Sequence, residues 1–514
     1  MERESRVNKS LLNARMNLIC YFVSLVVAFF TRKILLDYLG TEFIGFTGTL
    51  GSLLGFLSLA ELGVGIAIGY VLYQPIFDDD KRKINEIISV LGYLYRKIGF
   101  FILGMGIVLS CFLPLIFRST ELSMTIVFLG FYSYLFSSLF SYFFNYRMSL
   151  LSADQRNYLV TGVFQIVNTS KVVIQMILAY YTKSFYLFLI IEFLGGLINS
   201  IILNRVIDRT YPWLKTEIKL GKTLFRKYPE IGKYIKQLFV HRIAGFVQFQ
   251  TLPIFIYSFV SLPMVALYTN YTLVTQRIQG LMSGILDSTG AGVGNLISEG
   301  NQQKIYNVYK ELFAVRAFIS GVFACCVYYL IPSFIELWLG EEYLLSNLVS
   351  LLIVVQLYLF LLRGVTDQFL FGYGLFYDVW APIAESIVFV LFSVVFGIYY
   401  GLPGVLFGPL VANVIIIYGW KPFFLFRKGF KRPICQFYYL LFLHLLPSII
   451  VFFCATKISE LAMDVLSIPF GWLNWVMRSV IFTLFVFLFL YTLFYPVSEG
   501  MREATNRFLK RKKL

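Results

Sequence analysis

Long uninterrupted apolar runs constrain this sequence more than any other feature. Segments such as the one from Ile481 to Leu493 are apolar on every side, so they lack the alternation of polar and apolar residues typical of a barrel strand. A bilayer core about 30 Å thick needs roughly 20 such residues per helix. The chain has 58% hydrophobic and only 14% charged residues, which is far more apolar than a water-soluble domain. We therefore expect an all-α, polytopic membrane protein.

The apolar runs predict about 14 transmembrane helices. The longest polar stretch, at residues 205–239, divides six runs before it from eight after it. The predicted helices cover residues 12–34, 43–73, 91–117, 123–145, 158–181, 184–204, 240–262, 264–286, 307–333, 346–370, 379–400, 402–425, 437–456 and 471–495.

A weak internal similarity supports a division into two halves. Residues 61–65 (ELGVG) resemble residues 288–292 (STGAG), and the same offset places Arg15 on Arg242. Such a repeat predicts two pseudo-symmetric six-helix lobes around a central cavity, followed by two C-terminal helices. Coincidence among glycine-rich helix ends is the alternative. The predicted parts are an N-terminal lobe at 1–208, a cytoplasmic inter-lobe loop at 209–239, a C-terminal lobe at 240–432, and two extra helices with a basic cytoplasmic tail at 433–514.

The net charge of +16 is distributed unevenly across the predicted membrane. Most of the 44 Lys and Arg residues fall in the tails and in alternate loops, on the side that holds the N-terminus. This asymmetry is typical of cytoplasmic segments. We expect both termini to be cytoplasmic, with the 205–239 loop and residues 510–513 facing anionic lipid headgroups. The charge therefore indicates membrane lipids as partners, and not nucleic acid.

Neither a cofactor nor catalytic chemistry is expected. The six cysteines lie in or beside apolar runs without metal-ligand spacing, so we interpret them as small buried hydrophobic residues and expect no metal site. The predicted external loops are too short to hold a catalytic domain. We expect a transporter with no catalytic residues.

Several polar residues lie inside the apolar runs. An ionisable group in a membrane helix costs about 3 kcal/mol on insertion scales, so it should face a cavity or a partner. Residues three or four apart share a helix face. The fifth run thus places Gln165, Asn168 and Lys171 on one face, and the eighth carries Gln276 with Arg277 beside it. Hydrogen bonding between packed helices is the alternative for the neutral residues.

Charged residues of both signs occur in other runs. The tenth run carries Arg363 and Asp367, four residues apart and therefore placed for an intrahelical pair. Glu61, Glu192 and Glu385 are candidates either for ion coupling or for charge partners of the buried cations. The sequence leaves that choice open.

Two stretches in the first half carry a family resemblance, namely residues 31–40 (TRKILLDYLG) and, after Gly45, residues 57–65 (LSLAELGVG). They resemble bacterial polysaccharide flippases, which move lipid-linked O-antigen or capsule repeat units and belong to the multidrug, oligosaccharidyl-lipid and polysaccharide exporter superfamily. With the number of runs and the repeat, the resemblance covers about residues 10 to 425. It implies two six-helix bundles that face each other across a cavity and open alternately to the two leaflets.

The resemblance also implies roles for particular cations. In relatives, cations on the first and on the seventh to eighth helices line the cavity, and the matching positions here are Arg15, Arg242 and Arg277. Lys171 and Arg363 are candidates from their own positions in apolar runs.

The expected function is that of a flippase in the bacterial cytoplasmic (inner) membrane. Its substrate would be a polyprenyl-pyrophosphate-linked oligosaccharide moving toward the outer leaflet for surface polysaccharide synthesis, with the polysaccharide polymerase and chain-length machinery as partners. One alternative is an ion-coupled multidrug exporter of the same superfamily, which should present acidic residues to a cationic substrate. A remote alternative is a membrane glycan polymerase or ligase, which normally needs a sizeable external loop.

Overall fold

The chain folds into helices throughout the part that is described. The computed structural model describes residues 6–57, 61, 64–286, 293, 296–297, 299–375, 378, 380–465 and 471–511, and these contain no β-strand. Ten helical segments among them are long and apolar enough to cross a membrane. The predicted class, an all-α polytopic membrane protein, is confirmed.

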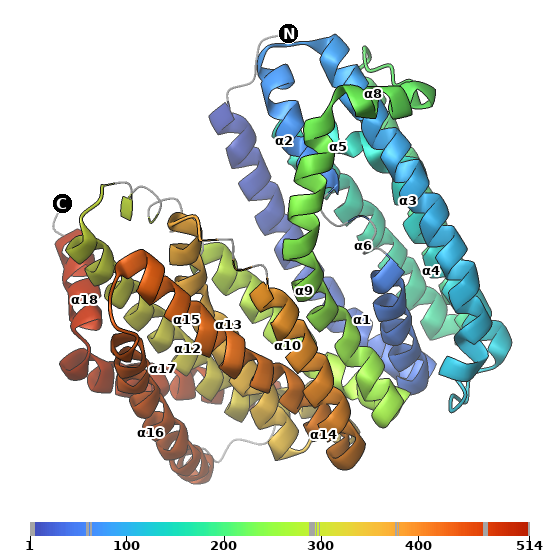
Figure 1. The fold of residues 1–514 in the computed structure, drawn as a ribbon. Coiled ribbons are helices and arrows are strands. Elements are labelled where there is room, and N and C mark those ends of the chain that lie inside the picture. The colour runs from blue at the N-terminus through green and yellow to red at the C-terminus, as the bar shows by residue number, and fades with distance from the viewer. Residues whose placement is uncertain are drawn as a thin grey trace. The chain divides into compact units, whose positions relative to one another are not determined.

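Two compact units make up the fold, residues 1–266 and 267–514. We describe each by itself (Figure 1). The helices of the first are α1 (Arg6–Leu57), α2 (Val64–Phe77), α3 (Lys81–Ile116), α4 (Met124–Phe143), α5 (Met148–Ala153), α6 (Asn157–Thr182), α7 (Phe185–Thr210), α8 (Gly221–Lys227) and α9 (Pro229–Phe259), with short 3₁₀ turns at Asn145–Arg147 and Ile218–Leu220.

The second unit starts within α10 (Leu262–Leu286). Two stretches after α14 are wound as π-helices, η6 and η7. The further elements are α12 (Gln302–Trp338), a 3₁₀ turn at Glu341–Tyr343, α13 (Asn347–Gly372), α14 (Trp380–Ala412), η6 (Asn413–Trp420), α15 (Lys421–Phe424), η7 (Leu425–Phe430), α16 (Cys435–Val465), α17 (Trp472–Val497) and α18 (Glu499–Arg511).

Within the described residues each predicted apolar run falls on helical segments, but two pairs of runs are joined and the run at 43–73 is divided between α1 and α2. The first two runs share α1, which bends at Gly40, and the runs at 379–400 and 402–425 are joined at Gly401. Both glycines have positive φ, +81° and +59°, a region that a residue with a Cβ rarely adopts. Helix α18, which lies in the basic tail, was not predicted.

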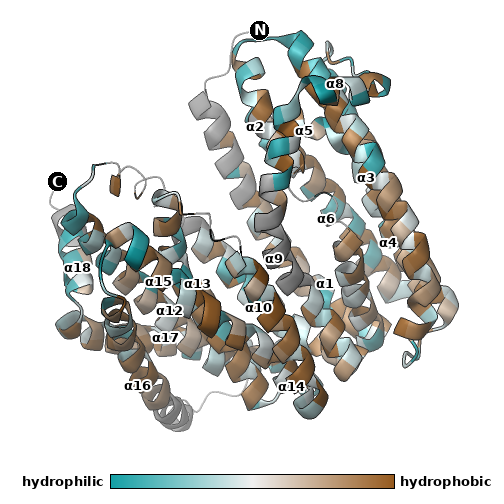
Figure 2. Cartoon of the chain, viewed as in Figure 1, coloured by the Kyte–Doolittle hydropathy of each residue, from teal (hydrophilic) through white to brown (hydrophobic). Residues whose placement is uncertain are grey.

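Several helices begin at a side chain that caps their free backbone N–H groups. Ser123 accepts a hydrogen bond at the start of α4, and Ser184 does so at the start of α7. Figure 2 shows hydrophobic residues along α3, α4 and α14 and hydrophilic residues near α8 and α18. This is the distribution expected of helices that cross a bilayer and end in water.

Helix α9 belongs to the first unit because it packs on α1 and α2. Gly45 lies directly against the backbone of Leu262, and the Arg32 guanidinium donates a hydrogen bond to the carbonyl of Ala266 at 2.8 Å. These contacts lie within the first unit, whose last residue is Ala266. The predicted internal repeat falls partly on residues 288–292, which lie outside the described residues, so it stays a prediction.

Candidate functional site

The first unit holds an ion pair between two membrane helices. The Lys171 ammonium of α6 lies 2.7 Å from a carboxylate oxygen of Glu192 on α7. Gln175 donates to the other carboxylate oxygen at 3.1 Å and to the carbonyl of Phe188. The side chains of Lys171 and Glu192 are 17% and 13% exposed. Of the two options left by the sequence for Glu192, the geometry matches that of a charge partner. We call Lys171 and Glu192 the Lys171 pair, and Gln175 donates to it.

The other polar residues of α6 point in more than one direction. Gln165 faces α1, where it accepts a hydrogen bond from Ser24 at 2.9 Å, and it donates to Thr169. Asn168 is exposed and, with Lys171, lines a pocket. The stripe predicted from helical spacing is thus split, because α6 packs between α1 and α7.

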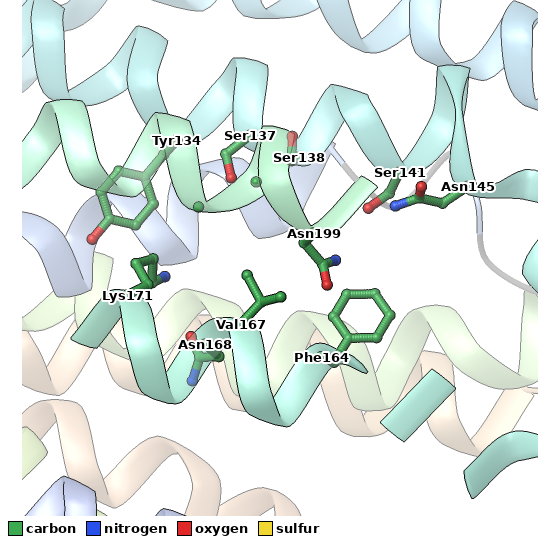
Figure 3. Close-up of a pocket in the computed structure, with 12 residues that line it drawn as sticks. Tyr134, Ser137, Ser138, Ser141, Asn145, Phe164, Val167, Asn168, Lys171 and Asn199 are labelled. Atoms are coloured by element: carbon green, nitrogen blue, oxygen red, sulfur yellow. The ribbon is translucent and has the colours of Figure 1, made fainter. Parts of the chain in front are cut away.

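That pocket lies inside the first unit and has a volume of about 300 Å³. Side chains of α4, α6 and α7 line it, together with Asn145 of the following 3₁₀ turn. Figure 3 shows Asn199 of α7 between the serines of α4 and the Phe164 and Val167 side chains of α6. Sequence patterns did not single out this pocket, although the three serines of α4 (Ser137, Ser138 and Ser141) lie on adjacent turns.

Two glycines of α7 bring the walls of the pocket together. A Cβ at Gly195 would meet the Lys171 side chain, and a Cβ at Gly196 would meet the side chain and the Cα of Ser137. Small residues commonly allow such close approach between membrane helices. The pair Gly195–Gly196 thus fixes the spacing of α7 from both α4 and α6.

The second unit holds a cluster with more positive than negative charge. Asp367 of α13 accepts a hydrogen bond from the Lys421 ammonium at 2.8 Å, and the guanidinium of Arg363 lies 3.9 Å away. The predicted intrahelical pair of Arg363 and Asp367 is confirmed. Arg363 also lies over the ring of Phe360, 4.7 Å from its centroid.

Arg316 of α12 adds a third cation beside Asp367. It is only 5% exposed and donates to the carbonyl of Leu361 at 3.4 Å. Gly364 makes room for it, since a Cβ there would meet its guanidinium. We call Arg316, Arg363, Asp367 and Lys421 the Asp367 cluster. Its formal charge is positive because three cations are grouped with one carboxylate.

Sequence reasoning missed two members of this cluster. Lys421 lies near the end of the predicted run at 402–425 and is not singled out by the sequence pattern; it follows η6 directly and meets Asp367 of another helix. Arg316 stands in the middle of the apolar run at 307–333. That position was the signal that could have identified it, since a cation there needs a partner or a cavity.

Glu61 has tyrosine partners in place of a cation. Tyr95 donates to its carboxylate at 2.7 Å, and Tyr142, whose ring packs edge-on against Tyr95, is a second donor. Glu385 of α14 is 7% exposed and has no hydrogen bond or ion pair within the described part of the chain. Coupling roles for both residues stay predictions.

For the remaining predicted cations we describe only the helix that carries each one and the exposure of its side chain where it is described. Arg15 lies on α1 with an exposed side chain, and Arg277 is half-buried on α10 beside the exposed Gln276. Arg242 lies on α9, and its side chain is outside the described residues. Their roles in substrate binding stay predictions.

Comparison with known proteins shows the same architecture at low sequence identity. No protein-family model and no curated protein matches the chain. Lipid II flippase MurJ, in an inward closed conformation, aligns with a TM-score of 0.65 and 16% identity, over 93% of this chain and 98% of that one. An inward-facing multidrug resistance transporter of the MATE family in the MOP superfamily aligns with a TM-score of 0.61 and 16% identity, over 80% and 95%. The chain therefore has the fold of these membrane transporters, as its family resemblance predicted.

Proposed function

We propose that the protein is a flippase that carries a polyprenyl-pyrophosphate-linked oligosaccharide across the membrane by alternating access. The observation that supports this substrate most directly is the surplus of positive charge in the Asp367 cluster. Lys421 and Arg363 both pair with a single carboxylate, and Arg316 lies beside them. Such a group in membrane helices would attract an anion.

The chemistry of the substrate explains why a cationic path is needed. Moving a single small ion from water into an apolar medium costs on the order of 20 kcal/mol in the idealised case. Arginine and lysine side chains replace part of the lost hydration by charge-assisted hydrogen bonds to phosphate oxygens. The lipid tail can stay in the bilayer meanwhile, so the protein supplies a route and forms no bond.

The comparisons support transport as the general activity. The two solved structures compared above are named as a lipid II flippase and a multidrug resistance transporter. We infer the finer points from the sequence: a bacterial cytoplasmic membrane, cytoplasmic termini, a central cavity between the halves, and a polysaccharide polymerase acting on the product.

A multidrug exporter is the second candidate because the MATE transporter shares the fold. That function would need carboxylates that face a cationic substrate. Glu61 and Glu385 are the available residues, and Glu61 is engaged by tyrosine hydroxyls. The positive surplus around Asp367 makes an anionic substrate the better proposal.

Reconstitution would separate the two candidates. The full-length protein in proteoliposomes should flip a fluorescent polyprenyl-pyrophosphate disaccharide, detected by an impermeant lectin, and should leave a neutral glycolipid of the same sugar unmoved. Ethidium export without movement of the pyrophosphate lipid would contradict the proposal and favour the exporter.

A further inference from the structure

The pocket of the first unit contains a buried acceptor without a donor. Asn199 is 9% exposed, and its side-chain oxygen has no hydrogen-bond partner among the described residues. Leaving a buried polar atom unsatisfied is costly, so this oxygen is expected to have a partner that is not part of the chain. Figure 3 shows this side chain in the middle of the pocket.

The rest of the wall offers both donors and acceptors. The Asn145 side-chain oxygen already accepts from Asn204 at 3.2 Å, which leaves the Asn145 amide nitrogen as a donor. Ser137 and Ser141 add hydroxyls that can donate and accept. From Tyr134 to Ser141, seven helical steps of about 1.5 Å each give a wall about 10 Å long.

The electrostatics of the pocket favour a neutral ligand. Lys171 is the only charged side chain among the described residues that line it, and its charge is balanced by Glu192 at 2.7 Å. Both carboxylate oxygens of Glu192 are engaged, so neither an anion nor a cation finds an uncompensated opposite charge. This contrasts with the Asp367 cluster.

The size and the mixed lining indicate an organic ligand. A volume of about 300 Å³ is at the lower end of the range for small-molecule pockets, roughly 300–1,000 Å³. The rings of Tyr134 and Phe164 and the Val167 side chain supply apolar surface beside the amides and hydroxyls. A group that combines C–H surface with several hydroxyls matches both kinds of lining, because each hydroxyl donates and accepts.

We propose that the pocket between α4, α6 and α7 is a binding site for a neutral sugar residue, with Asn199 accepting a hydrogen bond from one of its hydroxyls. The inference rests on the proposed function only for the source of the sugar, which would be the oligosaccharide of the lipid-linked substrate.

Saturation-transfer NMR on the full-length protein in nanodiscs tests the site with N-acetylglucosamine, galactose and glucose as probes. Monosaccharides have few atoms, so binding in the millimolar range is expected. Asn199→Leu should weaken it at least tenfold, and Ser141→Ala should weaken it less. The matched control is Asn157→Leu at the exposed start of α6, which should bind as the unmodified protein does.

Three results would decide the matter. If none of the sugars receives saturation transfer from the unmodified protein, the pocket holds water only and the proposal is wrong. Binding to Asn199→Leu at unchanged strength would place the sugar elsewhere, which also overturns it. Inorganic pyrophosphate is a separate probe: its failure to bind while the sugar binds would count against the proposed function and leave this site standing.

Discussion

The two units treat charge inside the membrane in opposite ways. In the first unit, Lys171 meets Glu192 and the pair is neutral. In the second, Asp367 is shared by Lys421 and Arg363 with Arg316 beside them. A balanced pair can hold helices together without attracting an ion, whereas a surplus charge leaves a site that an anion can complete. We therefore propose a packing role for the first group and a substrate role for the second.

Charge reversal in the Asp367 cluster should have the largest effect. Lys421→Glu should reduce flipping of the pyrophosphate lipid by about 100-fold, because a charge-assisted hydrogen bond contributes about 1.5–3 kcal/mol and the new carboxylate also repels the substrate. Flipping in proteoliposomes measures this at matched protein density. Lys428→Glu, at an exposed position of η7, is the control. Equal losses in both variants would remove the special role of the cluster.

Breaking the Lys171 pair should affect folding more than transport. Lys171→Met leaves Glu192 without its ion-pair partner, at a cost of about 3 kcal/mol by analogy with other buried pairs. Thermal unfolding in detergent should show the loss. The double variant Lys171→Met with Glu192→Gln should recover most of the stability and also flip the lipid. A stable double variant that no longer flips the lipid would show that Lys171 serves the substrate and would break the comparison.

A matched pair of glycine substitutions, one in each unit, tests the comparison between the units by disturbing their helix packing. In Gly196→Ala the new methyl meets the backbone of Ser137, whereas in Gly364→Ala it meets the movable guanidinium of Arg316. Overpacking against backbone costs about 1–3 kcal/mol, so Gly196→Ala should lower the melting temperature more. Gly364→Ala should instead slow flipping with a smaller stability change. A larger loss of melting temperature in Gly364→Ala together with slower flipping in Gly196→Ala would contradict the packing role of the first unit's group and the substrate role of the second's.

The smallest effect is expected at a surface pair, which gives a baseline for the buried groups. The Lys310 ammonium donates to Glu499 at 2.6 Å, and this hydrogen bond lowers the pKa of Glu499 below its ordinary value of 4.5. The stabilisation is therefore present above pH 4.5 and is lost as the pH falls through the lowered pKa. Hydrogen exchange in α18 should rise modestly under acid. Glu499→Gln should abolish that pH dependence, and an unchanged profile would exclude this pair as its cause.

The sequence predicted the helices well because the cost of unpaired backbone groups in lipid leaves few alternatives to apolar helices. It predicted the pair of Arg363 and Asp367 because both lie on one helix, where spacing fixes geometry. It could not predict that Lys171 meets Glu192 or that Lys421 meets Asp367, since these contacts depend on how different helices pack. The pocket at Asn199 could not be predicted for the same reason, because its walls come from three helices and a turn.

The winding of η6 has a consequence for how this chain tolerates change. Residues 413–420 follow π-helical geometry directly before Lys421, and an extra residue per turn rotates everything that follows. Deleting one residue there would leave the segment as hydrophobic as before, so its hydropathy profile would not change noticeably. Yet Lys421 would turn to another side of its helix, and Asp367 would lose its nearest cation. In this segment the number of residues is therefore more tightly constrained than the identity of each apolar residue.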